Sequence, residues 1–94
     1  MGRVYKSVWD ALDFDEAETE ELKIKSRLMI EIERFYVDSG LTQKEAAKKL
    51  GATQSRLNDI LKGRIEKCTI DRLVKMLASI GKHVSVTVED KKAA

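Results

Sequence analysis

The chain contains few of the residue types on which disulfides, metal sites and catalytic centres depend. Its 94 residues include one cysteine, Cys68, and one histidine, His83. One cysteine excludes a disulfide within the chain, and a single cysteine and histidine leave no recognisable spacing of metal ligands. Phosphate-cradling glycine loops and nucleophile–base pairs are also missing from the sequence. We therefore expect no catalytic residue, no bound metal, no cofactor and no enzymatic activity.

Long apolar runs are missing too. No apolar stretch approaches the roughly 18 residues that a membrane span needs, and no secretory signal segment is visible. These features predict a cytoplasmic protein without a membrane partner. A chain of 94 residues is long enough for one domain with a modest core, but too short for an enclosed active-site cleft of the usual size.

Charge is abundant, and its two signs are separated along the chain. Charged residues make up 36% of the sequence, although the formal net charge is only +2. Residues 10–21 contain seven acidic residues and no lysine or arginine, whereas residues 42–67 contain seven basic residues and three acidic ones. A basic segment in an otherwise balanced chain indicates a phosphate-binding surface.

Residues 42–63 have the pattern of two short helices joined by a tight turn. Thr42 and Glu45 form a capping box, in which the hydroxyl and the carboxylate each accept a backbone N–H. Gly51 is placed to end the first helix, Thr53 to cap the second, and Gly63 follows that second helix. The apolar stripes are Ala46, Ala47 and Leu50 in the first helix and Leu57, Ile60 and Leu61 in the second. The two alanines let a neighbouring helix come very close.

The second predicted helix carries polar side chains opposite its apolar stripe. At about 100° per residue, Ser55, Asp59 and Lys62 share that face, Arg56 and Asn58 flank it, and Gln54 projects from the first turn. Side chains of this kind can read base edges in the major groove of double-stranded DNA. An acid fits this face poorly because phosphate repels it. Asp59 is therefore expected to accept from cytosine, to pair with Arg56 or Lys62, or to lie outside the groove.

The spacing of this segment resembles a known family. Counting from Gln43, a small residue falls at the fifth position, glycine at the ninth, and aliphatic residues at the fifteenth and eighteenth. Together with LTQKEAAKKLG at 41–51 and Lys62-Gly63-Arg64, this resembles the helix-turn-helix of the phage-repressor-like XRE family. The segments SVWDALDF, LKIKSRLMIEIERF and LVKMLASIGKHVSVTV resemble, more narrowly, small XRE proteins that include HigA-like antitoxins of type II toxin–antitoxin pairs.

The resemblance implies a set of DNA-binding residues. Gln43 would contact a phosphate and brace Gln54, which would bond an adenine or a neighbouring base. Ser55 and Arg56 would add base or phosphate contacts, and the chemistry of Arg56 also suits bidentate binding of guanine. The residues expected to hold the DNA backbone are Thr53, Asn58, Lys62 and Arg64.

The remaining segments predict an all-α fold with four helices over residues 17–81 and a candidate fifth near the N-terminus, and the resemblance implies that this fold is of the lambda-repressor-like type. Asp15 or Thr19 is placed to cap a long helix that ends at Gly40, and Thr69 is placed to cap a last helix that ends near Gly81. The N-terminal arm, residues 1–16, contains Trp9 and other apolar groups. It either folds over the core as a short helix or strand or is presented to a protein partner.

Residues 82–90 alternate between valine and polar residues, which predicts a short C-terminal β-strand with Val84, Val86 and Val88 on one side. A strand needs a partner for its backbone groups. That partner is either the VYKSV segment near the N-terminus or, as we favour, the same strand of a second protomer. The latter pairing gives a two-fold homodimer with these valines at its interface. Residues 91–94 are expected to fray.

These features predict a transcriptional repressor that binds a palindromic operator as a dimer. The resemblance adds the expectation that the protein is the antitoxin of a toxin–antitoxin pair. The alternative is a protein-interaction module that mainly neutralises a basic toxin, with DNA binding secondary, and the acidic residues 10–21 would then attract that toxin. A further alternative is that the two short helices are only a packing unit.

Overall fold

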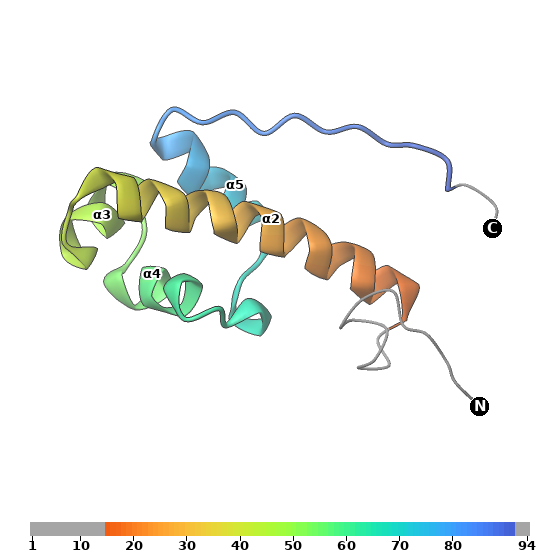
Figure 1. Cartoon of the computed structure of the whole chain (residues 1–94), viewed down its shortest axis with the longest axis horizontal. Coiled ribbons are helices and arrows are strands. Elements are labelled where there is room, and N and C mark those ends of the chain that lie inside the picture. The colour runs from red at the N-terminus through yellow and green to blue at the C-terminus, as the bar shows by residue number, and fades with distance from the viewer. Residues whose placement is uncertain (1–14, 92–94) are drawn as a thin grey trace.

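The computed structural model describes residues 15–91, which form four α-helices and one short 3₁₀ helix (Figure 1). The elements in chain order are α2 (Glu16–Ser39), α3 (Gln43–Leu50), α4 (Gln54–Leu61), η1 (Ile65–Lys67) and α5 (Ile70–Ser79). No strand occurs between residues 15 and 91, so the all-α prediction is confirmed for this part of the chain. The predicted arm around Trp9, with its candidate fifth helix or strand, lies outside the described residues.

The long helix α2 begins and ends at the residues that its sequence predicts. Asp15 is the N-cap, and its carboxylate accepts a hydrogen bond of 2.7 Å from the backbone N–H of Glu18. Gly40 ends the helix in the left-handed conformation, with φ of 69°. Leu28, Met29 and Ile32 are buried, which places the inner face of α2 against the other helices.

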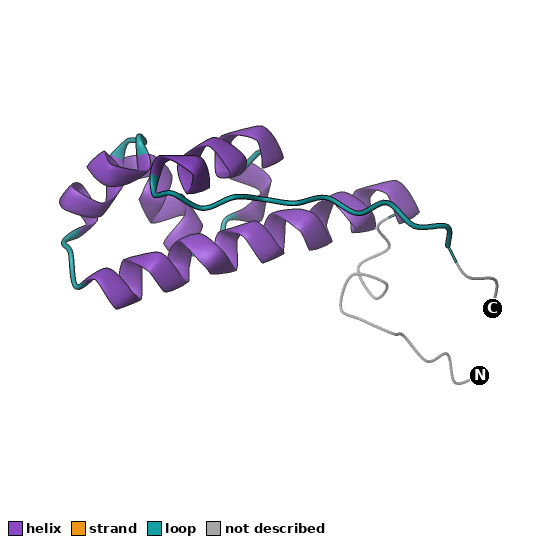
Figure 2. Cartoon of the chain, turned by 90° about the horizontal axis from the view of Figure 1, so that it is seen from above, coloured by secondary structure: helices purple, strands orange, loops and turns teal. Residues whose placement is uncertain are grey.

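The three shorter helices gather beside the C-terminal half of α2, and the first turns of α2 extend beyond them (Figure 2). Each α-helix contributes a large aliphatic side chain that is at most 1% exposed, namely Ile32, Leu50, Leu57 and Leu73. The core is therefore a single cluster shared by all four helices. None of the helices in residues 15–91 is long and apolar enough to cross a membrane.

The predicted C-terminal strand at residues 82–90 is wrong for the single chain. Figures 1 and 2 show the segment after α5 running extended along α2, in the opposite direction. Beyond Lys82, none of its backbone groups up to residue 91 forms a backbone hydrogen bond within the described residues. The alternating valines make an extended conformation favourable, but a strand also requires a neighbour to accept and donate those bonds.

The three valines of this segment have different environments. Val84 packs against the core, whereas Val86 and Val88 are 80% and 91% exposed. At the end of the segment, Lys91 donates to the carboxylate of Glu16, and residues 92–94 of the expected frayed end lie outside the described part. This contact lowers the pKa of Glu16 and raises the pKa of Lys91.

The turn between α3 and α4 depends on a glycine at position 51. Gly51 has φ of +67°, and its backbone N–H bonds the carbonyls of Ala47 and Lys48 at the end of α3. A Cβ added at this position would lie 3.2 Å from Oγ of Ser79 in α5. The position therefore requires both a left-handed conformation and a small residue.

We expect Gly51→Ala to destabilise the protein more than Gly63→Ala. Both glycines have positive φ, so each alanine carries a backbone penalty of about 1 kcal/mol. Only the alanine at position 51 would also press on Ser79, because a Cβ at Gly63 meets no atom of residues 15–91 within 4 Å. Urea unfolding measures the difference. Equal losses in the free energy of unfolding would contradict the close approach of the turn to α5.

Candidate nucleic-acid interface

The two short helices of the pair are fixed by side-chain caps at their N-termini. In α3, Thr42 Oγ1 accepts from the Glu45 N–H at 3.2 Å, and Glu45 Oε1 accepts from the Thr42 N–H at 3.0 Å. The capping box is thus confirmed, and its hydrogen bonds lower the pKa of Glu45. In α4, Thr53 Oγ1 accepts from the Arg56 N–H at 3.1 Å. The Thr53 hydroxyl keeps its own proton to donate, as a contact with phosphate requires.

The outer face of α4 carries neutral hydrogen-bonding side chains, the half-buried acid Asp59 and, at the C-cap, the cation of Lys62. Leu57 and Ile60 are buried on the inner face. The outward residues are Gln54, Ser55 and Lys62, which are exposed, and Asn58, which is half-buried. Gln43 is the first residue of α3 and is half-buried. The structure therefore presents these predicted contact residues on the solvent side of the helix pair.

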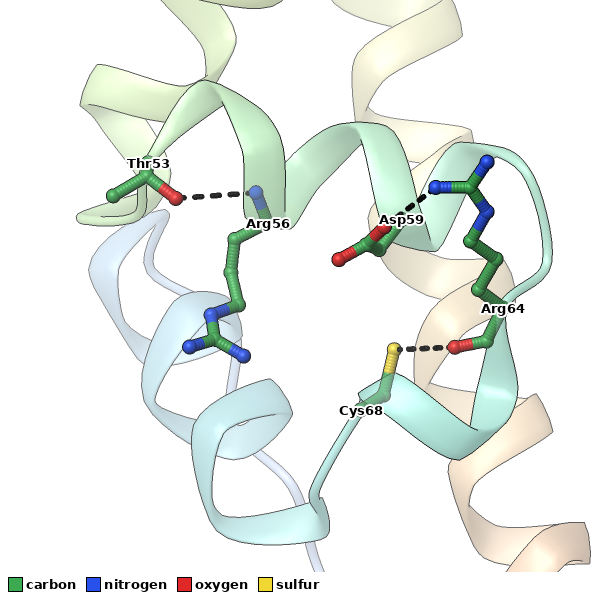
Figure 3. Close-up of polar contacts among 5 residues, drawn as sticks. All are labelled: Thr53, Arg56, Asp59, Arg64 and Cys68. Atoms are coloured by element: carbon green, nitrogen blue, oxygen red, sulfur yellow. Dashed lines mark hydrogen bonds and ion pairs between the residues drawn. The ribbon is translucent and has the colours of Figure 1, made fainter.

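Arg56 lies apart from these residues. Figure 3 shows its side chain leaving α4 on the flank that faces α5. The guanidinium lines a cavity together with Arg72 and Lys75 of α5. Arg56 is half-buried there, about 100° around the helix from Ser55. This placement separates Arg56 from the side chains with which it was expected to read bases.

Asp59 pairs with a residue that the sequence did not indicate. Its Oδ1 lies 3.1 Å from Nη1 of Arg64, across the turn that contains Gly63 (Figure 3). The backbone N–H of Arg64 also bonds the carbonyl of Asp59, at 2.9 Å. The Asp59 side chain is 17% exposed and that of Arg64 is 45% exposed. The expected partners, Arg56 and Lys62, were therefore wrong, because the chain reverses after α4 and brings position 64 back to position 59.

Cys68 contacts the loop that carries Arg64 from the core side. The thiol donates to the Arg64 carbonyl at 3.5 Å, and the side chain is buried in the core. Burial, and next to it the charge of Asp59, raises the pKa of the Cys68 thiol. A protonated, buried thiol is a packing group. Arg64 is thus fixed through its backbone, by the contacts from Cys68 and Asp59, and through its guanidinium.

In residues 15–91, no three or more His, Cys, Asp or Glu side chains are grouped so that they could hold a metal ion. His83 is exposed in the extended segment after α5.

Comparison with known proteins identifies the fold of this helix pair. A family model described as a helix-turn-helix domain matches residues 11–89. The chain belongs to this helix-turn-helix family. A solved structure provisionally described as an XRE family transcriptional regulator superposes with a TM-score of 0.73 and 25% sequence identity, over 82% of this chain and 90% of that chain. A search of curated proteins found no match. The XRE-like helix-turn-helix expected from the sequence is thereby confirmed.

The pairing of Asp59 with Arg64 predicts the direction in which DNA affinity changes when Asp59 is removed. We expect Asp59→Ala to weaken binding to double-stranded DNA by about threefold, because an exposed pair that orients Arg64 contributes roughly 0.2 to 1 kcal/mol. A general charge effect predicts the opposite, since removal of an acid near phosphate should strengthen binding. The measurement is a titration of labelled duplex at fixed salt.

Two further variants isolate the pair. Asp59→Asn keeps one acceptor oxygen and should lose less affinity than Asp59→Ala. In an Arg64→Ala background, Asp59→Ala should cause no further loss. Tighter binding by Asp59→Ala in the otherwise unchanged protein would show that Asp59 opposes DNA binding and does not position Arg64.

Proposed function

We propose that the chain is a DNA-binding transcriptional regulator of the XRE type that reads a duplex with the outer face of α4. The observation that carries this proposal is the division of α4 into two faces in a member of the helix-turn-helix family. Leu57 and Ile60 are buried, and Gln54 and Ser55 are exposed at the N-terminal end. The description of the superposed structure as a transcriptional regulator supports the same function.

The groups divide into those that specify sequence and those that hold the backbone. The amide of Gln54 matches the donor and acceptor pair of adenine in the major groove, and Ser55 and Asn58 add shorter hydrogen-bonding groups. Along the chain, Gln43 begins α3, Thr53 and Lys62 cap the two ends of α4, and Arg64 follows two residues later. Their amide, hydroxyl and cationic groups suit phosphate, which fixes the register and supplies salt-dependent affinity.

Substitutions at Gln54 and Lys62 should therefore have different effects. Gln54→Ala should change which operator sequence is preferred, at about 1 to 3 kcal/mol for the base it contacts. Lys62→Ala should weaken binding to all duplexes equally and lower the slope of log K against log salt by about one unit. Binding of each variant to an operator and to random DNA over a salt series measures both effects. Equal losses on the two DNAs for Gln54→Ala would remove Gln54 from the sequence-reading residues.

Repression at a palindromic operator further requires two copies of α4 related by a two-fold axis. We infer that the segment after α5 provides the contact between copies. Its Val86 and Val88 are almost fully exposed, and its backbone groups beyond Lys82 make no backbone hydrogen bonds within the described residues. The backbone N–H and C=O groups of two such segments can hydrogen-bond to each other as an antiparallel strand pair. Val84 is not needed for this contact, because it already packs against its own core.

A double substitution tests the proposed dimer contact. Val86→Asp with Val88→Asp should convert a dimer into a monomer, because charges facing each other across a strand pair repel. Val37→Asp on α2 is the matched control, since Val37 is also exposed, at 68%. Sedimentation equilibrium measures the mass. A dimer that survives the double substitution would place the contact elsewhere.

A second role is suggested by the acidic start of α2. Glu16, Glu18, Glu20 and Glu21 are all exposed there, on the turns that extend beyond the other helices. A basic partner could bind this end and leave α4 free, as the likeness to HigA-like antitoxins implies. Copurification with a basic toxin encoded beside this chain, lost when the four glutamates become glutamine, would support the antitoxin role, and unchanged copurification would exclude this surface.

A further inference from the structure

A cavity of about 290 Å³ lies between the start of α4 and the outer face of α5. The α3–α4 turn, Thr53 and Arg56 of α4 line one side. On the other side, Arg72 and Lys75 line it together with Met76. Positions 72 and 75 are three residues apart in α5, so their side chains share one face of that helix.

The charges around this cavity have one sign. Of the described residues that line it, three are cationic and none is acidic. Gathering three cations raises the free energy of the empty site unless an anion or bulk water compensates them. The first turn of α4 adds the partial positive charge of a helix N-terminus. The two arginines can each donate two parallel N–H groups, which is the geometry that phosphate oxygens accept.

The position of Arg56 on α4 indicates which kind of phosphate would reach this cavity. A helix with its side chains is about 10 to 12 Å wide, and the major groove is about 12 Å wide, so a helix in the groove has a phosphate backbone along each flank. Ser55 occupies the outer face of α4, and Arg56 occupies the flank toward α5. A side chain on that flank faces the backbone and not the base edges.

We infer that this cavity binds a phosphate group through Arg56, Arg72 and Lys75, and that its occupant is a backbone phosphate of the duplex read by α4. The inference rests on the proposed function and extends it, because it adds α5 to the DNA contact surface. It also assigns Arg56 to phosphate binding, where the sequence left base and phosphate contacts open. A free phosphate compound is the other source of the same ligand chemistry.

The test is the double variant Arg72→Ala with Lys75→Ala, which leaves α4 unchanged. We expect its affinity for an operator and for random duplex to fall by the same factor, at least about threefold, and the salt slope to fall by about one unit. The preference for the operator should stay unchanged. Arg72→Lys with Lys75→Arg keeps both charges and should retain most of the affinity, which separates charge from folding.

The matched control removes two charges elsewhere. Lys23→Ala with Arg34→Ala gives the same change in net charge at two exposed positions of α2. If the Arg72/Lys75 variant and this control lose affinity and salt slope equally, the cavity does not bind a DNA phosphate and the inference is overturned.

A titration with inorganic phosphate, followed by amide chemical shifts of residues 51–56, separates this inference from the proposed function. If the protein binds no duplex but shows saturable phosphate shifts that the double variant loses, the proposed function fails and the cavity takes a free phosphate compound. If it shows neither duplex binding nor saturable shifts, both proposals fail.

Discussion

Burial of one face of α4 is the constraint on which the rest of the structure depends. Leu57 and Ile60 enter a cluster to which every other α-helix contributes a buried aliphatic side chain. Each such side chain stabilises the fold by about 1.5 to 3 kcal/mol relative to exposure, which is large for a domain of this size. Ala46 and Ala47 are buried at the surface of α3, where larger side chains would keep the helices apart. Because the buried residues fix the rotation of α4 about its own axis, they also determine which of its side chains face solvent.

Around that outer face, charge is placed on the flanks and kept off the centre. Ser55 and Gln54 are neutral, whereas Arg56 lies toward α5 and Arg64 follows the helix. Asp59 would disturb this arrangement if it faced a duplex alone, but it is mostly covered and bonded to Arg64. The pair thus converts an acid on the recognition helix into a support for a cation. Specificity and salt-dependent affinity come from different residues for this reason.

Local chemistry made much of this predictable from sequence. The caps at Asp15, Thr42 and Thr53 and the glycine turn at 51 are determined by residues within a few positions, so their spacing is sufficient evidence. Thr69 occupies the N-cap position of α5 without a side-chain hydrogen bond, which shows that even a cap depends on the surrounding backbone. The partner of Asp59 and the direction of Arg56 depend on tertiary packing, which residue spacing does not encode. The strand at 82–90 is absent from the single chain because alternation reports a preference for extended backbone, and pairing requires a second segment.

The most direct measurement for the central claim is selection of bound sequences from a random pool of duplexes at a stated salt concentration. An outer face of α4 that reads bases, carried by two copies in a symmetric pair, predicts enrichment of two related, inverted half-sites about 10 base pairs apart, centre to centre. Folded protein that enriches no sequence, even at low salt, would contradict the account.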